Sequence, residues 1–281
     1  MTVRLLALDL DGTLAWRGDE VLPATRQALE RARSQGVEVV IATGRRYRTT
    51  LRVADALGFV PRAVCLGGAL VKESSGRTLH SVAFSPGELA QVAGAVRDAG
   101  LSPIGQRDHV DGGADFVVDG GLAWNGWMSR YAESNRDFSE WTRDLGAERR
   151  EDILVLGALG PRRELLAVAA RIDELHPGRF TTLVTPLPQD SSSGGGCYLE
   201  VASAVVCKWQ GLTRLADALD IPREAICAVG DEVNDLTMIR GAGLGVAMGN
   251  GNPEVRAAAD WTTGRHDEDG LVAVVDRILG Q

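Results

Sequence analysis

The sequence predicts an α/β fold, a doubly wound parallel sheet with a smaller α+β module inserted into it. Three observations support this fold class. In the first third of the chain, apolar strands with polar ends alternate with amphipathic helices. Between about residues 81 and 202 the pattern changes to short strands, two long helices and glycine-rich turns. From Lys208 onward the alternation of strand, polar end and helix returns.

The elements of the first segment follow from local patterns. The apolar run at residues 5–8 predicts a buried strand, and Gly36 is a typical stop for the helix that follows it. The predicted elements here are strands at 5–8, 37–42 and 63–66 and helices at 23–35 and about 47–57. Open parallel sheets bind ligands at the carboxyl ends of their strands, so the polar residues after these strands form the candidate site.

The rest of the chain is interpreted in the same way. In the middle segment the patterns predict helices at 86–99 and 161–175 and strands at 116–118, 153–156, 180–185 and 198–201. The final segment is predicted to contain a helix at 210–219, strands at 225–229 and 243–247, and another helix between these two strands. The chain is therefore expected to form a discontinuous core, residues 1–81 and 203–281, and an inserted module, residues 82–202.

Composition excludes several classes of protein. The 281 residues suffice for a sizeable core, and 44% hydrophobic with 24% charged residues is ordinary for a globular protein. A formal net charge of −8 argues against a general nucleic-acid or anionic-membrane partner. The four cysteines show no C-x-x-C spacing, and no run approaches ~18 apolar residues. We expect a cytoplasmic protein without a nucleic-acid or membrane partner.

Two carboxylates follow the first predicted strand. The chain reads Asp9-Leu10-Asp11-Gly12-Thr13 at this point. Because side chains alternate along a strand, Asp9 and Asp11 are expected to leave its end on the same side. Like charges at that spacing repel each other, which a fold tolerates where a cation or a catalytic task compensates. An ordinary Asp-Gly turn gives the same pattern, so this segment alone leaves both interpretations open.

A second acidic group follows the strand predicted at 225–229. Asp231, Asn234 and Asp235 lie within five residues at a junction between strand and helix. Asp231 and Asp235 can both face the end of the first strand, and their oxygens are the ligands that Mg²⁺ prefers. The alternative is an acidic helix N-terminus, which the helix dipole favours.

Two further positions fit a phosphate site. Thr43 and the backbone amides around Gly44 are expected to donate hydrogen bonds at a helix N-terminus. Lys208 opens the first helix after the insertion and brings a fixed positive charge. Either residue alone is more often a helix cap or a solvated surface lysine, so their order along the chain is what matters.

Taken in their order along the chain, the four segments described above resemble the four motifs of the haloacid dehalogenase (HAD) superfamily of phosphatases. The C-terminal segments 246–251, 259–260 and 268–270 are similar to the Cof-like, type IIB branch. The resemblance implies a Rossmann-like core and an inserted C2-type cap domain, residues 82–202, that sets substrate specificity. The chain departs from the branch at Gly67-Gly68, where Asn-Gly is usual, and at 204–207, where a Gly and a Ser are commoner.

The resemblance also implies catalytic roles. Asp9 would attack phosphorus to form an aspartyl-phosphate, and Asp11 would be the general acid and then the general base. Mg²⁺ would be held by Asp9, the backbone carbonyl of Asp11 and Asp231. The residues expected to support these groups are Asn234 and Asp235, which orient metal-bound water and Lys208, and the phosphate-binding residues Thr43, Gly44, Lys208 and Arg45.

The expected function is Mg²⁺-dependent hydrolysis of a small organic phosphomonoester, with sugar phosphates as the first class to consider. The partner would be that small-molecule ester, and the protein would be a monomer or a homodimer. Two alternatives remain open on the sequence: a phosphotransferase or phosphomutase on the same scaffold, and a non-catalytic regulator that binds a phosphorylated ligand. A dinucleotide-binding oxidoreductase is not favoured, because no G-x-G-x-x-G follows the first strand.

Overall fold

The computed structural model describes residues 2–16, 18–109, 113–187 and 195–280. They form two compact units, Met1–Ser81 with Val206–Gln281, and Val82–Val205. The sequence-based division into residues 1–81 with 203–281 and residues 82–202 stays a proposal. The confirmed fold class is a parallel-sheet α/β core with an inserted α+β module. No helix among the described residues is long and apolar enough to cross a membrane.

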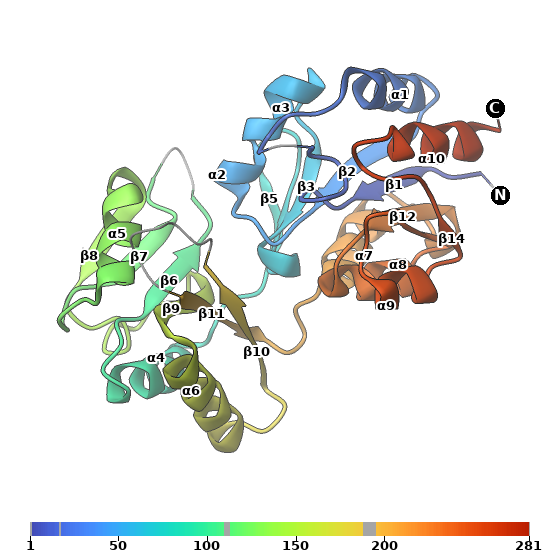
Figure 1. The fold of residues 1–281 in the computed structure, drawn as a ribbon. Coiled ribbons are helices and arrows are strands. Elements are labelled where there is room, and N and C mark those ends of the chain that lie inside the picture. Colours follow the sequence, from blue (N-terminus) through green and yellow to red (C-terminus); the bar gives the residue numbers. More distant parts are fainter. Residues whose placement is uncertain (1, 17, 110–112, 188–194, 281) are drawn as a thin grey trace. The chain divides into compact units, whose positions relative to one another are not determined.

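The larger unit is built on an eight-stranded sheet in the order β14-β13-β12-β1-β2-β3-β4-β5 (Figure 1). Its strands are β1 (Leu5–Leu8), β2 (Glu38–Ala42), β3 (Arg62–Cys65), β4 (Leu70–Lys72), β5 (Thr78–Ser81), β12 (Ile226–Gly230), β13 (Leu244–Ala247) and β14 (Trp261–Thr262). The six strands from β14 to β3 are parallel, whereas β4 and β5 continue the sheet in antiparallel fashion.

Helices cover both faces of this sheet. Those of the larger unit are α1 (Pro23–Ser34), α2 (Tyr47–Thr50), α3 (Arg52–Leu57), α7 (Lys208–Ala218), α8 (Leu236–Gly241), α9 (Pro253–Ala258) and α10 (Gly270–Leu279), with short 3₁₀ helices η1 (Leu66–Gly68), η3 (Arg223–Ala225) and η4 (Val233–Asp235). On β1, Leu6 and Leu8 pack with α1, α3 and α10, whereas Leu5 and Ala7 pack with α7 and α8. This period of two makes the strand apolar on both faces, as a central parallel strand requires.

The smaller unit contains a six-stranded sheet in the order β10-β11-β9-β6-β7-β8. Its elements are α4 (Pro86–Asp98), β6 (Ile104–Arg107), β7 (Phe116–Asp119), α5 (Gly126–Ser134), η2 (Arg136–Phe138), β8 (Ser139–Thr142), β9 (Ile153–Pro161), α6 (Arg162–Leu175), β10 (Phe180–Pro186) and β11 (Gly196–Ser203). All neighbouring strands are antiparallel except β7 and β8. Helices α4 and α6 share one apolar core with the sheet, and α5 packs into a second one.

Several local predictions differ from the structure. The helix predicted at 47–57 is two helices, α2 and α3, which meet at Leu51. The strand predicted to end at Leu66 ends at Cys65, because Leu66 takes a φ of 50° and opens η1. The strands β4, β5, β6, β8 and β14 and the helices α5, α9 and α10 were not predicted. Except for α10, these elements have two to nine residues and carry too little periodicity to be distinguished from loops.

Candidate active site

The site lies where the neighbouring parallel strands β1 and β12 end. Leu8 is paired with Val229, and the Asp9 amide donates a hydrogen bond of 2.9 Å to the Val229 carbonyl. Asp9 is the first residue after β1, and Asp231 is the first residue after β12. Because parallel strands end at one edge of the sheet, this pairing brings the two acidic motifs together.

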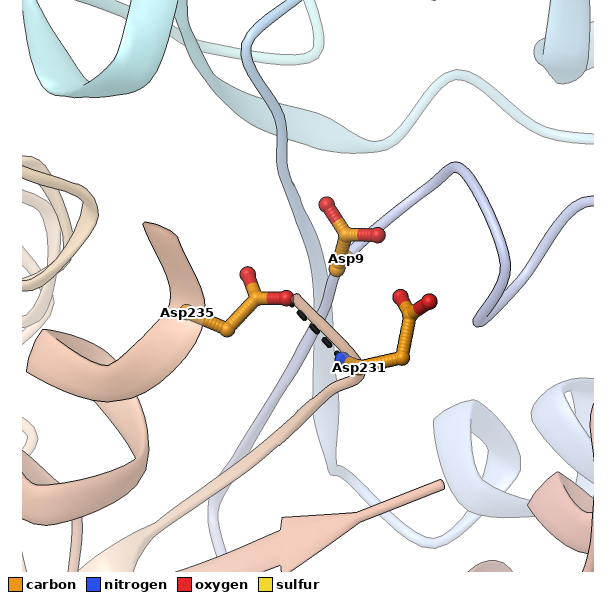
Figure 2. A group of neighbouring side chains, drawn as sticks. All are labelled: Asp9, Asp231 and Asp235. Atoms are coloured by element: carbon orange, nitrogen blue, oxygen red, sulfur yellow. Dashed lines mark hydrogen bonds between the residues drawn. The ribbon is translucent and has the colours of Figure 1, made fainter. Parts of the chain in front are cut away.

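Three carboxylates converge at this edge. Asp9, Asp231 and Asp235 each offer one oxygen that lies within 4.8 Å of the other two (Figure 2). Asp9 and Asp231 are 6% exposed and Asp235 is fully buried. Asp11 is not part of this group. Three buried carboxylates at such short range require compensating positive charge.

Lys208 supplies part of that charge. Its ammonium donates one hydrogen bond of 2.6 Å to Oδ1 of Asp9 and another of 2.6 Å to Oδ1 of Asp235. Lys208 is only 1% exposed, although it stands at the first position of α7. The predicted placement of a lysine at this site is therefore seen in the structure, but the lysine is buried between carboxylates. The four charged groups still carry a formal net charge of −2 at neutral pH when all are ionised.

The carboxylate oxygens are not equivalent. Both oxygens of Asp235 are used, because Oδ2 accepts hydrogen bonds of 3.0 Å from the amides of Asp231 and Glu232. Oδ1 of Asp231 accepts a hydrogen bond of 3.0 Å from the Thr13 hydroxyl. Among the described residues, Oδ2 of Asp9 and Oδ2 of Asp231 accept no hydrogen bond. Asp235 thus orients Lys208 and the Asp231 loop, whereas Asp9 and Asp231 each keep a free oxygen.

Burial dominates the electrostatics of this group. It raises the pKa of Asp9 to about 7, with the charges of Asp235 and Asp231 adding to the rise and Lys208 opposing it. It raises the pKa of Asp231 to about 6, although the Thr13 hydrogen bond opposes the change. Burial also tends to lower the pKa of Lys208, but the two carboxylates outweigh it, so that its pKa is raised. Lys208 therefore stays charged, while the carboxylates lack a full counter-charge.

Two glycines allow the backbone to approach these carboxylates. Gly12 has a φ of 86°, and a Cβ at this position would lie less than 3.0 Å from Oδ2 of Asp231. A Cβ on Gly230 would similarly overlap the Asp235 carboxyl group. The side chain of Asn250 donates a hydrogen bond of 2.9 Å to the Gly12 carbonyl and so fixes the loop after β1. At both positions the carboxylate occupies the space that a side chain would take, so only glycine fits.

Thr43 and Gly44 follow β2, the other neighbour of β1. Thr43 is buried, and its hydroxyl oxygen accepts a hydrogen bond of 3.1 Å from the Arg45 amide, which leaves the hydroxyl hydrogen available. The prediction that these residues lie at a helix N-terminus is wrong, because α2 begins only at Tyr47 after its N-cap Arg46. Gly44 is exposed and has no left-handed φ, and a Cβ on it would meet no atom within 4 Å.

Asp11 and Arg45 form a separate ion pair. Nε and Nη2 of Arg45 donate hydrogen bonds of 2.9 and 2.5 Å to the two carboxylate oxygens of Asp11. Nη1 of Arg45 donates one of 2.5 Å to Oδ1 of Asp19. The Asp11 side chain is 60% exposed, unlike that of Asp9. The alternation expected to place Asp9 and Asp11 together does not apply, because β1 ends at Leu8 and both residues belong to the loop.

The remaining predicted residue, Asn234, is exposed in η4. Among the described residues no hydrogen bond joins its side chain to the carboxylates, so its role stays a prediction. Sequence reasoning did not assign roles to Thr13, Asp19 and Asn250. Thr13 and Asn250 carried a local signal, since they belong to the first motif and to the segment 246–251; Asp19 reaches the site through a contact with the distant Arg45.

Gly68, the residue after the departure at Gly67, lies against the second departure at Cys207. Gly68 has a φ of 115°, and a Cβ on it would overlap the carbonyl of Cys207. Cys207 is the N-cap residue of α7, and its Sγ accepts a hydrogen bond of 3.4 Å from the Gln210 amide. Gly68 and Cys207 thus position the start of α7, where Lys208 stands.

Comparison with known proteins identifies the family. A model of the haloacid dehalogenase-like hydrolases matches residues 6–275. The chain is 26% identical over 289 residues to the phosphatase YwpJ of Bacillus subtilis, covering 99% of this chain and 100% of the relative. It is 25% identical over 291 residues to the pyridoxal phosphate phosphatase YbhA of Escherichia coli, covering 98% of each.

A solved structure agrees with these relatives. The crystal structure of a haloacid dehalogenase-like hydrolase from Bacteroides thetaiotaomicron is 25% identical, with a TM-score of 0.77 over 98% of this chain and 99% of that one. The chain therefore belongs to the haloacid dehalogenase-like hydrolases, and it is an enzyme of their phosphatase group. The relatives are consistent with the Cof-like, type IIB branch and its cap domain, as the motifs predicted.

Proposed function

We propose that this protein is a Mg²⁺-dependent phosphomonoester hydrolase that acts on a small organic phosphate through an aspartyl-phosphate. One observation carries the proposal. Two buried carboxylates, Asp9 and Asp231, each present a free oxygen at the ends of adjacent strands, beside the buried ammonium of Lys208. The arrangement offers a nucleophile, a place for a divalent cation and a fixed positive charge for a phosphoryl group.

The donor set fits Mg²⁺. Its free oxygens are hard ligands, and the three carboxylates with Lys208 carry a formal net charge of −2 when all are ionised. The ligands would be Asp9, Asp231 and the Asp11 backbone carbonyl. Bound there, the cation would neutralise the phosphate so that a carboxylate can approach it. Asp235 is not assigned as a ligand, because the Lys208 ammonium and two backbone amides occupy its oxygens.

The chain's own residues divide the chemistry between them. Asp9 is the nucleophile: its free oxygen attacks phosphorus and the bond to the leaving alkoxide breaks. Asp11 gives its proton to that alkoxide, and its carboxylate then takes a proton from the water that hydrolyses the aspartyl-phosphate. Lys208 holds Asp9 in place and stabilises charge on the phosphoryl oxygens. Asn234 would help to orient metal-bound water.

The phosphate would be held by donors that come from the loop after β2. Thr43 keeps a hydroxyl hydrogen available in a buried position, and the open space at Gly44 allows close approach to the backbone. Arg45 adds a guanidinium at the more exposed side of the site. Together with Lys208 these groups match the several negatively charged oxygens of a phosphomonoester.

Substrate choice is assigned to the inserted module, residues 82–202 in the sequence-based division, with the catalytic chemistry in residues 1–81 and 203–281. Sugar phosphates remain the proposed class. The relative in Escherichia coli is named for pyridoxal phosphate, so a phosphorylated aromatic ring is the direct competitor in any test. The cytoplasmic location, the lack of a nucleic-acid partner and a monomeric or homodimeric state stay predictions.

The decisive experiment is a panel of phosphate esters that includes sugar phosphates, pyridoxal phosphate and an aryl phosphate. Phosphate release is measured with Mg²⁺ and after metal removal, and substrates are ranked by kcat/KM. Metal-dependent release that is lost in Asp9→Asn supports the proposal. Binding without turnover across the panel would indicate a regulator instead, and transfer of the phosphoryl group to an alcohol in preference to water would indicate a phosphotransferase.

A further inference from the structure

We propose that Asp19 is a positioning residue that holds the Arg45 guanidinium at the active site, so that substrate phosphate can replace the Asp11 carboxylate on it. The inference rests on the proposed function, in which Arg45 binds phosphate. It goes further by giving a role to a residue outside the four motifs. It also explains why the proposed general acid is held by an arginine in the structure.

The hydrogen bonds of Arg45 divide between two edges of its guanidinium. One edge, Nε and Nη2, grips both oxygens of Asp11 at 2.9 and 2.5 Å. Nη1 instead donates a hydrogen bond of 2.5 Å to Oδ1 of Asp19. Nη2 also reaches the Gly18 carbonyl at 3.2 Å. The Asp19 contact can therefore persist while the other edge changes its partner.

The edge that holds Asp11 is suited to a phosphate. An arginine fork binds two oxygens of a phosphate with the same geometry as two oxygens of a carboxylate. Asp11 is a weak competitor, because its side chain is 60% exposed and the pair is screened by water. A phosphomonoester dianion carries a greater charge than a carboxylate. Phosphate arrival would thus occupy the fork and release Asp11, which would take up a proton from solvent and then transfer it to the leaving group.

Glu20, the residue after Asp19, is fixed by a backbone hydrogen bond. The Trp16 amide donates a hydrogen bond of 2.9 Å to the Glu20 carbonyl, and Asp11 forms a β-bridge with Ala15. The Asp19 side chain is 33% exposed, and Arg45 is 23% exposed. Once Asp11 leaves, Asp19 and the Gly18 carbonyl are the contacts that keep this long side chain in one orientation. Without Asp19, phosphate would have to order the arginine as it binds.

When Asp19 is replaced, the loss of its negative charge and the loss of a positioning contact are expected to change phosphate binding in opposite directions. Asp19 is a negative group close to an anion site, so its removal should strengthen phosphate binding if only long-range electrostatics matters. The positioning role predicts weaker binding, because the guanidinium loses its anchor. Asp19→Asn therefore separates the two explanations by the sign of the change.

The test measures KM for an aryl phosphate and the inhibition constant of inorganic phosphate in the full-length, Mg²⁺-loaded protein. The variants are Asp19→Asn, Arg45→Ala and their combination, with Glu20→Gln as a matched control that removes a charge from the adjacent residue. We expect Asp19→Asn to raise both constants roughly threefold to tenfold, which corresponds to the cost of immobilising one long side chain when phosphate binds. Its kcat should change less than about twofold, and Glu20→Gln should not raise either constant.

The double variant decides between positioning and a general structural role. In the Arg45→Ala background, Asp19→Asn should have no further effect on either constant. If Asp19→Asn weakened phosphate binding equally in the wild-type and Arg45→Ala backgrounds, the proposal would be overturned. Tighter or unchanged phosphate binding in Asp19→Asn alone would overturn it as well. Calorimetric titration with inorganic phosphate gives the same comparison without turnover, so the inference can fail or succeed independently of the proposed hydrolase activity.

Discussion

Gly12 and Asp231 lie so close together that a single added Cβ at residue 12 would overlap the free Oδ2 of Asp231. Gly12→Ala should therefore displace a proposed metal ligand, and its φ of 86° adds backbone strain of about 1–3 kcal/mol. The matched control is Gly36→Ala, whose φ of 83° gives similar strain but whose Cβ meets no atom within 4 Å. Both variants should lose stability in urea titrations, and only Gly12→Ala should lose Mg²⁺-dependent activity by more than about tenfold. Equal activity in the two variants would contradict this account of the loop.

Lys208 is expected to be essential for both stability and activity. Lys208→Met leaves Asp9 and Asp235 buried without their shared cation, which typically costs about 3–5 kcal/mol. Lys72→Met is the control, since Lys72 is also buried but lies on β4 outside the carboxylate group. Chemical denaturation at neutral pH and phosphate release are the measurements. A Lys208→Met protein with full turnover would remove Lys208 from the proposed chemistry.

The raised pKa values predict how metal binding depends on pH. A carboxyl group whose pKa is raised by folding contributes stability that is present at low pH and is lost as the pH rises through its folded pKa. For Asp231 and Asp9 these values are about 6 and about 7. The metal-free protein should thus lose stability between about pH 4 and about pH 8 through these groups, and Mg²⁺ should offset the loss. The difference in Tm with and without Mg²⁺ should therefore increase from about pH 5 to about pH 8. A difference that is constant or decreases over this range would contradict the assigned ligands.

Gly68 should affect activity through α7. Gly68→Ala would push against the Cys207 carbonyl and shift the N-terminus of the helix that carries Lys208. We expect loss of stability of about 1–3 kcal/mol together with lower kcat. Gly67→Ala is a suitable control, because Gly67 also has a positive φ of 65° but its Cβ would meet no atom within 4 Å. Similar kcat in the two variants would show that the Gly68 contact does not position Lys208.

The sequence was sufficient for most of the periodic elements, although it missed the helix α10. The apolar run before Asp9 and the helix α1 show strong patterns, and the fold class is confirmed. The hairpin β4–β5 was missed because its strands have three and four residues and extend the sheet against its parallel direction. Short antiparallel edge strands depend on pairing with a neighbour more than on their own pattern.

The candidate site shows the same limit. The order of the motifs along the chain was enough to place Asp9, Asp231, Asp235 and Lys208 near one another, because parallel strands end at one edge of the sheet. It did not reveal that Asp235 anchors Lys208 with one oxygen and the Asp231 loop with the other. Nor did it reveal the contacts of Arg45 with Asp19. Such contacts join segments far apart in the chain, so no local spacing encodes them.

The most direct test of the central claim is to trap the phosphoryl group on the enzyme. Asp11→Asn is mixed with Mg²⁺ and an aryl phosphate, whose good leaving group needs no proton, and the reaction is quenched in acid. We predict one phosphoryl group on the peptide that contains Asp9, because hydrolysis of the aspartyl-phosphate is slowed without the Asp11 carboxylate. A phosphoryl group on another residue, or phosphate release by Asp9→Asn at the wild-type rate, would contradict the assignment of Asp9 as the nucleophile.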